Sequence, residues 1–97
     1  MRRTSNLALN RAFPEALSSI PADNKVRIAR DTGNPYDRDA VGVWLDGYPE
    51  TLGWLYRKDA NRPDVLRKLD AGGEIRGRIE RRKRAGAAAG LVVVFWL

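Results

Sequence analysis

A chain of 97 residues, of which 43% are hydrophobic, has room for one domain built around one core. It contains no cysteine and no histidine, which excludes disulfides, thiol nucleophiles, zinc sites built on sulfur or imidazole, and histidine-based general-base catalysis. The net charge of +6 suggests an anionic partner, with nucleic acid as the first candidate, although ordinary solubility charge explains it equally well.

The positive charge is concentrated in the second half of the chain. Residues 1–48 carry seven Lys or Arg against six Asp or Glu, whereas residues 49–97 carry eleven against six. The longest apolar run, Leu91–Leu97, has seven residues, against roughly 20 for a membrane helix. No hydrophobic stretch follows the basic residues at the N-terminus, so no signal peptide is expected. We therefore expect a cytoplasmic protein that does not associate with membranes.

Alternation of apolar and polar residues predicts that most of the chain forms β-strands. Residues 1–24 are the least regular part: Leu7 and Leu9 alternate like the start of a strand, but Pro14 and Pro21 interrupt the pattern. Beyond them, five segments have the composition and period of strands: 25–30, 40–45, 51–56, 75–83 and 91–97.

Turn and helix signals separate these strands. Residues 31–37 are a dense cluster of turn formers, and Asp46-Gly47 is typical of a hairpin turn. Apolar residues at helical spacing predict a helix within 58–70, which Gly72 would end. The connections are therefore short.

The predicted fold is mainly β, with one or two short helices. The Ala- and Gly-rich residues 85–90 are expected to form a flexible turn, and residues 91–97 a closing strand buried on both faces. No repeat, linker or second domain is visible in residues 1–97. The spacing of the strands predicts a single domain that is a small closed or nearly closed β-barrel, or a sandwich.

The most specific local pattern runs over residues 30–41. A basic strand leads into the sequence Asn-Pro-Tyr-Asp at residues 34–37, and an Ala-Val strand follows. This series resembles the signature of the HIRAN domain family. The resemblance extends to the Gly-centred strand at 52–55 and to the helix end at 69–73, and it covers residues 25–79 in all.

The resemblance implies a compact barrel of about six strands, similar to an OB-fold, that binds the 3′ end of single-stranded DNA. In the family, the tyrosine of the motif stacks on the terminal base and its aspartate accepts a hydrogen bond from the 3′-hydroxyl. These roles fall on Tyr36 and Asp37, with Asn34 in the same motif, and a phosphate contact falls on Arg57. No cofactor is expected.

The chemistry of the two motif residues agrees with these roles. An exposed tyrosine contributes ~1–3 kcal/mol by stacking on any base. A carboxylate only accepts hydrogen bonds, so Asp37 would recognise a terminal hydroxyl and repel a terminal phosphate. The alternative is a purely structural role, in which this motif only forms a tight turn with Tyr36 packed over it.

The chain departs from the family in its first strand. Members of the family carry there an arginine followed by aromatic residues, which sandwich the terminal base from the other side. In this chain only Arg11 and Phe13 lie at about the right distance along the sequence. They are the candidates for this role, and without them Tyr36 would stack alone.

Basic residues alternate along the strand at 75–83. Arg76 and Arg78 fall on one face, and Arg82 and Arg84 continue the same face. A row of guanidinium groups suits phosphates, so Arg76 and Arg78 are candidate nucleic-acid contacts. The competing reading is a solvated edge strand whose charges prevent edge-to-edge aggregation.

Two further sets of residues have simple structural explanations. Most of the tryptophans on predicted strands are expected to pack in the core: Trp44, Trp54 and Trp96. A cluster of carboxylates suits Mg²⁺ and a nuclease, but turn chemistry explains it more simply: Asp31, Asp37 and Asp39.

The leading hypothesis is a non-catalytic module that binds single-stranded DNA ends. In larger proteins of the family the module is fused to a helicase or a nuclease in DNA repair, so here such an enzyme would act in trans. The alternative is a protein-interaction module that keeps the barrel but has lost DNA binding. The third hypothesis is a metal-dependent nuclease.

Overall fold

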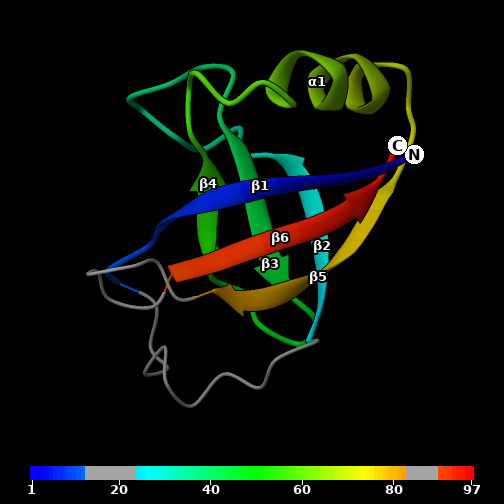
Figure 1. Ribbon diagram of the computed structural model, residues 1–97. Helices are drawn as coiled ribbons and strands as arrows, with labels where there is room; N and C mark the ends of the chain where they lie inside the picture. Colours follow the sequence, from blue (N-terminus) through cyan, green and yellow to red (C-terminus); the bar gives the residue numbers. More distant parts are fainter. Residues whose placement is uncertain (13–23, 83–89) are drawn as a thin grey trace.

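The computed structural model describes residues 1–12, 24–82 and 90–97, which form a six-stranded antiparallel barrel with one helix (Figure 1). The elements in chain order are β1 (Arg2–Leu9), β2 (Lys25–Arg30), β3 (Val41–Leu45), β4 (Gly53–Leu55), α1 (Arg62–Asp70), β5 (Ile75–Arg82) and β6 (Gly90–Trp96). The prediction of a mainly β fold with a closed barrel is confirmed. The expected turn at 85–90 lies outside the described residues except for Gly90, which begins β6.

The barrel closes because β1 pairs with strands on both of its sides. The strand order is β1-β4-β3-β2-β5-β6, with β6 returning to β1. The first part of β1 pairs with β6, from Arg2 to Asn6, and its last part pairs with β4, from Leu7 to Leu9. Each of the six described strands therefore has two neighbours, so none of them is an edge strand. In this order the β1–β4 pair lies across the barrel from the β2–β5 pair.

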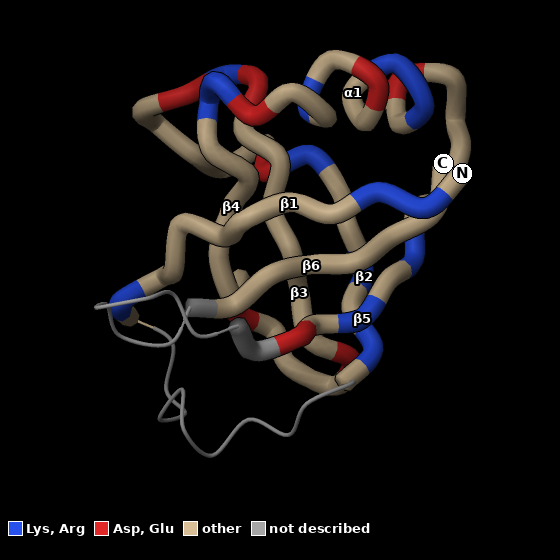
Figure 2. Tube along the Cα trace, in the orientation of Figure 1, with Lys and Arg blue, Asp and Glu red and all other residues tan. Residues whose placement is uncertain are grey.

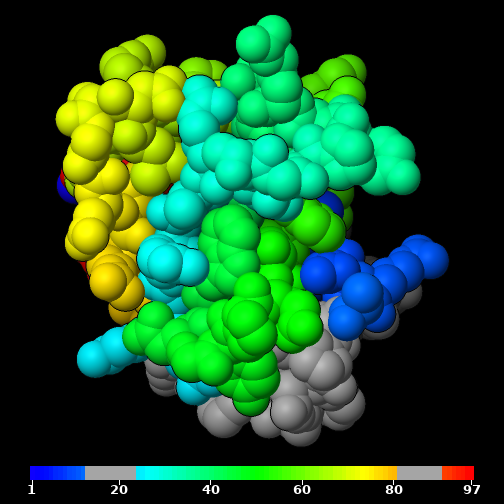
Figure 3. Space-filling view, turned by 180° about the vertical axis from the view of Figure 1, so that it is seen from behind, coloured from blue at the N-terminus to red at the C-terminus, as the bar shows by residue number. Residues whose placement is uncertain are grey.

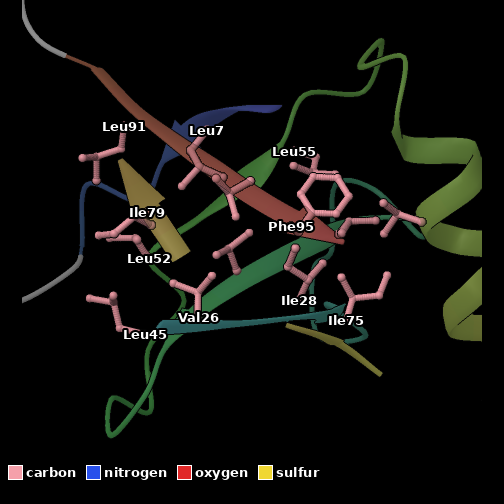
Figure 4. Packing of buried hydrophobic residues seen from close by; sticks show 14 residues of the cluster. Leu7, Val26, Ile28, Leu45, Leu52, Leu55, Ile75, Ile79, Leu91 and Phe95 are labelled. Carbon is pink, nitrogen blue, oxygen red and sulfur yellow. The ribbon is translucent and has the colours of Figure 1, made fainter. Parts of the chain in front are cut away.

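The core is formed by alternate residues of the strands. Val26 and Ile28 of β2 face inward, as do Ile75 and Ile79 of β5, and all four are buried (Figure 4). The inward faces predicted for these two strands are therefore confirmed. Burying each such side chain contributes about 1.5–3 kcal/mol relative to leaving it exposed.

Strand β6 is buried on both faces, as predicted. Val93 and Phe95 belong to the core, while Val92 and Val94 point to the other side and are also buried. In the strand register, Val94 lies between Thr4 of β1 and Arg78 of β5. The apolar run without alternation therefore corresponds to a strand whose outward-facing side chains are buried as well as its inward-facing ones.

The prediction that most tryptophans pack in the core is wrong. Trp44 and Trp54 are only partly buried and Trp96 is 44% exposed, and none of them belongs to the core cluster. Their sequence neighbours fill the interior instead, such as Phe95 beside Trp96. A barrel of six strands has a narrow interior, which branched aliphatic side chains and one phenyl ring already fill. The indole rings therefore lie on the outer wall.

Helix α1 covers one end of the barrel (Figure 1). It begins at Arg62, four residues later than the earliest start predicted, because Asp59 accepts the N–H of Asn61 and forms a turn before the helix. Val65 is fully buried against the strands. Gly72 ends the helix as predicted, with φ at +85°, where other residues are strained. Among the described residues, no helix has the length and apolar character needed to span a membrane.

We expect Gly77→Ala to lower the free energy of unfolding by about 1–3 kcal/mol, the range for overpacking in a rigid core. A methyl group on Gly77 would overlap the carbonyl oxygen of Val94 and crowd Phe95 on the neighbouring strand. Urea unfolding measures the loss. The matched control is Gly33→Ala, where the nearest atom would lie 3.9 Å away and the change should stay within about 0.5 kcal/mol. Equal stability of the two variants would contradict this account of barrel packing.

Candidate nucleic-acid interface

The loop between β2 and β3 is held by its own turn-forming side chains. Asn34 Oδ1 accepts the N–H of Tyr36 at 2.9 Å, and Asp37 Oδ1 accepts the N–H of Asp39 at 3.1 Å. The base of the loop is closed by the N–H of Asp31, which donates to the carbonyl of Ala40 at 2.9 Å. Side chains of Asn and Asp that bond backbone N–H groups two residues ahead build such turns. The turn predicted at 31–37 is therefore confirmed.

Tyr36 projects from this loop into solvent. Its side chain is 85% exposed, although the backbone on its N-terminal side is fixed by Asn34. The bland reading, in which the ring packs over the turn, does not fit this exposure. A large exposed ring on a rigid backbone is available to a ligand.

An open groove of about 610 Å³ runs beside Tyr36. One side is the loop from Asp31 to Asp37, and the other is formed by residues 54–57 at the end of β4, with Ala8 of β1 at the base. Figure 3 shows the loop standing out from the barrel on the same face as the end of β1, with a hollow between them. Trp54 is fixed there because its Nε1 donates to Asp31 Oδ2 at 2.8 Å.

The carboxylate of Asp37 forms hydrogen bonds with Arg62, the first residue of α1. Arg62 Nη2 lies 2.9 Å from Oδ1 and 2.8 Å from Oδ2 of Asp37, and Arg62 Nε donates to the carbonyl of Asp39 at 3.2 Å. The Arg62 side chain is only 9% exposed. The hydrogen bond from Arg62 is the main cause that lowers the pKa of Asp37 below its ordinary value of 3.8. The carboxylate is therefore anchored and ionised.

Sequence reasoning missed Arg62. One local signal was present: Arg62 is the first residue of α1, where the helix dipole disfavours a cation. An arginine at that position needs a carboxylate partner from elsewhere in the fold. The sequence does not tell which carboxylate this is, because Asp37 is 25 residues away.

Arg57 lies at the mouth of the same groove. Its Nη2 donates to the carbonyl of Tyr36, and its Nε lies 3.4 Å from Asp37 Oδ2. The side chain is nevertheless 67% exposed. The structure thus brings together four of the residues expected at the site: Asn34, Tyr36, Asp37 and Arg57.

The other two carboxylates of the acidic cluster have partners of their own. Asp31 accepts from Trp54, and Asp39 pairs with Arg30 at 3.0 Å. Arg30 also forms a bidentate pair with Asp70 of α1 at 2.7 and 2.9 Å, which lowers the pKa of Asp70. In the ranges that the structure describes, no group of three potential ligands is arranged to hold a metal ion. The cluster builds and anchors the loop.

Of the residues proposed for the first strand, Arg11 is not among the described residues that line the groove. Arg11 is exposed and follows the end of β1, where Asn10 is tied to the start of β4 by its N–H, which donates to the carbonyl of Leu52 at 2.9 Å. Residues 10–12 lie across the hollow from the loop in Figure 3. Phe13 lies outside the described residues. Ala8 is the residue of β1 that lines the groove.

Arg76 and Arg78 lie away from Tyr36. They are on β5, which is across the barrel from the β1–β4 pair (Figure 2). The edge-strand explanation of these arginines is wrong, because β5 is paired with β2 on one side and with β6 on the other. The predicted continuation of this face at Arg84 lies outside the described residues.

Comparison of the chain with known protein families, with curated proteins and with solved structures finds no match. The resemblance to the HIRAN family therefore rests on the motif residues alone and stays a prediction. The site must be interpreted from its own geometry.

We expect the stability of the protein to depend on the ionised form of Asp37. Its lowered pKa contributes stability above the ordinary pKa of 3.8, and this is lost as the pH falls from about 3.8 through the lower pKa of the folded state. Asp37→Asn should therefore be less stable than the parent at pH 7, and the difference should shrink toward about pH 2. Urea midpoints measured across this range test the prediction. Parallel curves for the two proteins would contradict it.

Proposed function

We propose that the protein is a non-catalytic module that binds the 3′-hydroxyl end of single-stranded DNA in the groove beside Tyr36. The observation that carries the proposal is the exposed ring of Tyr36, placed in one open groove with a carboxylate and a guanidinium, Asp37 and Arg57. These are the three groups that a terminal nucleotide needs for its base, its hydroxyl and its phosphate. A helicase or nuclease that uses such a module would act in trans.

Stacking on Tyr36 is favoured because the ring is presented by a fixed backbone. The N–H of Tyr36 donates to Asn34 and its carbonyl accepts from Arg57, so both peptide groups beside the ring are held. Binding then costs little conformational entropy of the loop. Every base has a flat face, so stacking supplies affinity without selecting a sequence.

Asp37 has one acceptor position left for a ligand. A carboxylate offers about four lone-pair positions. Arg62 uses both oxygens and the N–H of Asp39 uses Oδ1, which leaves capacity on Oδ2, the oxygen nearer Arg57. The side chain is 20% exposed, so one hydroxyl can reach it. A terminal phosphate in the same place would meet the negative charge.

We expect Tyr36→Ala to weaken the binding of any linear single strand by ~1–3 kcal/mol, because the stacked base loses its platform. Tyr36→Phe keeps the ring and should bind like the parent. Fluorescence anisotropy with a labelled oligonucleotide measures both. No binding by the parent at low salt would remove the DNA hypothesis and favour the protein-interaction alternative.

The test that most exposes the proposal compares oligonucleotides ending in a 3′-hydroxyl and a 3′-phosphate. We expect the parent to prefer the hydroxyl by about tenfold or more, the effect of one hydrogen bond to a charged group. Asp37→Asn should bring the two affinities close together, because the amide no longer repels the phosphate.

The matched control is Asp39→Asn, which removes the same charge from the same loop but leaves Asp37 and its contacts in place. It should keep the preference of the parent. Thermal melting must first establish that both variants are folded, since Asp37 also anchors the loop to α1. A folded Asp37→Asn protein that still prefers the hydroxyl as strongly as the parent would overturn end recognition.

A further inference from the structure

Four cations form a block on the outer wall of the barrel, on the side away from the groove. They are Lys25 and Arg27 of β2 with Arg76 and Arg78 of β5, called the basic wall below. Lys25 is opposite Arg78 in the strand register, and Arg27 is opposite Arg76. Directly opposed side chains have Cβ atoms about 4.5–5.5 Å apart. The block is therefore a compact patch of positive charge.

Tryptophan rings border this patch on both sides. The guanidinium of Arg78 lies 5.4 Å from the ring centre of Trp96, and that of Arg27 lies 5.5 Å from the ring centre of Trp44. Trp96 is 44% exposed and lines a hollow of about 570 Å³ together with Lys25, Arg76 and Arg78. Cations interleaved with an exposed aromatic ring are typical of surfaces that bind single-stranded nucleic acid.

The pairing of the described strands does not itself require cations at these four positions. Strand β5 is not an edge strand, because it pairs with β2 on one side and with β6 on the other, and like charges directly opposite each other across two strands are destabilising. Two carboxylates offset part of the charge, since Asp46 lies 3.7 Å from Arg76 and Glu80 lies 3.3 Å from Arg78. The pair of Arg76 with Asp46 is more than half exposed, and ion pairs this exposed contribute little, so a phosphate group competes with it readily.

We infer that the basic wall is a second binding site, which holds the phosphate backbone of single-stranded nucleic acid and stacks one base on Trp96. The exposed indole favours a single strand over a duplex, because paired bases keep their faces stacked on each other. Binding at the basic wall requires no end of the nucleic acid strand. The inference is independent of the function proposed for the groove. Because the β2–β5 pair lies across the barrel from the β1–β4 pair, which carries one side of the groove, the two sites would hold different segments of nucleic acid at the same time.

A circular single-stranded DNA tests the wall alone, because it has no end for the groove to bind. We expect the parent to bind it with an affinity that falls as salt rises, with a log–log slope of about 0.7 per phosphate contact. Lys25→Ala combined with Arg76→Ala should weaken binding at least tenfold and lower this slope by at least 0.7. Asp46→Asn should tighten binding, because it removes the carboxylate beside Arg76.

Matched controls distinguish the contribution of the basic wall to binding from the contributions of the groove and of the overall positive charge. Arg67→Ala removes an exposed cation on α1, outside the basic wall, and should leave binding of the circle within about twofold of the parent. Tyr36→Ala should also bind the circle normally, while it loses affinity for a linear strand. Trp96→Ala should weaken binding of the circle without changing the salt slope, because a stacked base carries no charge.

Two results would overturn the inference. One is a folded Lys25→Ala/Arg76→Ala protein that binds the circle like the parent. The other is equal affinity for the circle and for a duplex of the same length, which would leave no role for base stacking on Trp96. Neither result depends on the preference for a 3′-hydroxyl, which the Asp37 and Asp39 variants test separately.

Discussion

Closure of a narrow barrel is the constraint on which the surfaces of this protein depend. Because β1 pairs with both β4 and β6, the strands enclose a small interior that is occupied by aliphatic side chains and Phe95. Large polar rings and long cations have no place inside. They lie on the outer wall, where the pairing of the strands fixes their spacing. Residues alternate between the interior and the outer wall along each strand. Because the closed sheet is rigid, the outward-facing residues of neighbouring strands form patches with a fixed arrangement.

The ion pair between Arg62 and Asp37 connects this barrel to the groove. It fastens the loop between β2 and β3 to a helix whose Val65 is packed in the core. A second contact of the same kind, from Arg30 to Asp70, joins the end of β2 to the end of α1. Bidentate arginine pairs fix orientation as well as distance. The position of Tyr36 is thus set by charge pairing rather than by packing of its own ring.

Local rules were sufficient to predict five of the six described strands, the turn and the fold class, but not β1, which ends at Leu9 where alternation had suggested the start of a strand. Alternation in β2 identified Val26 and Ile28 as inward, and Asn34 and Asp37 form the backbone contacts expected of turn residues. Contacts between distant parts of the chain were not predictable in this way. The pairing of β1 between two strands and the partner of Arg62 both depend on three-dimensional closure. The tryptophans were misplaced because hydrophobicity alone does not report the size of the interior.

The groove beside Tyr36 and the basic wall differ in how far their positive charge is neutralised by carboxylates. Under the proposals, this difference gives the two sites different roles in binding. In the groove, each carboxylate of the loop has its own partner, so Asp37 and Arg57 present little net charge to a ligand. Under the proposed function, recognition there depends on stacking and on a single hydroxyl, which would give selectivity for an end but modest affinity. The basic wall carries an excess of positive charge, so its binding is stronger at low salt and indifferent to ends. Under the two proposals, the basic wall would retain a strand through its phosphate backbone while the groove samples the strand end.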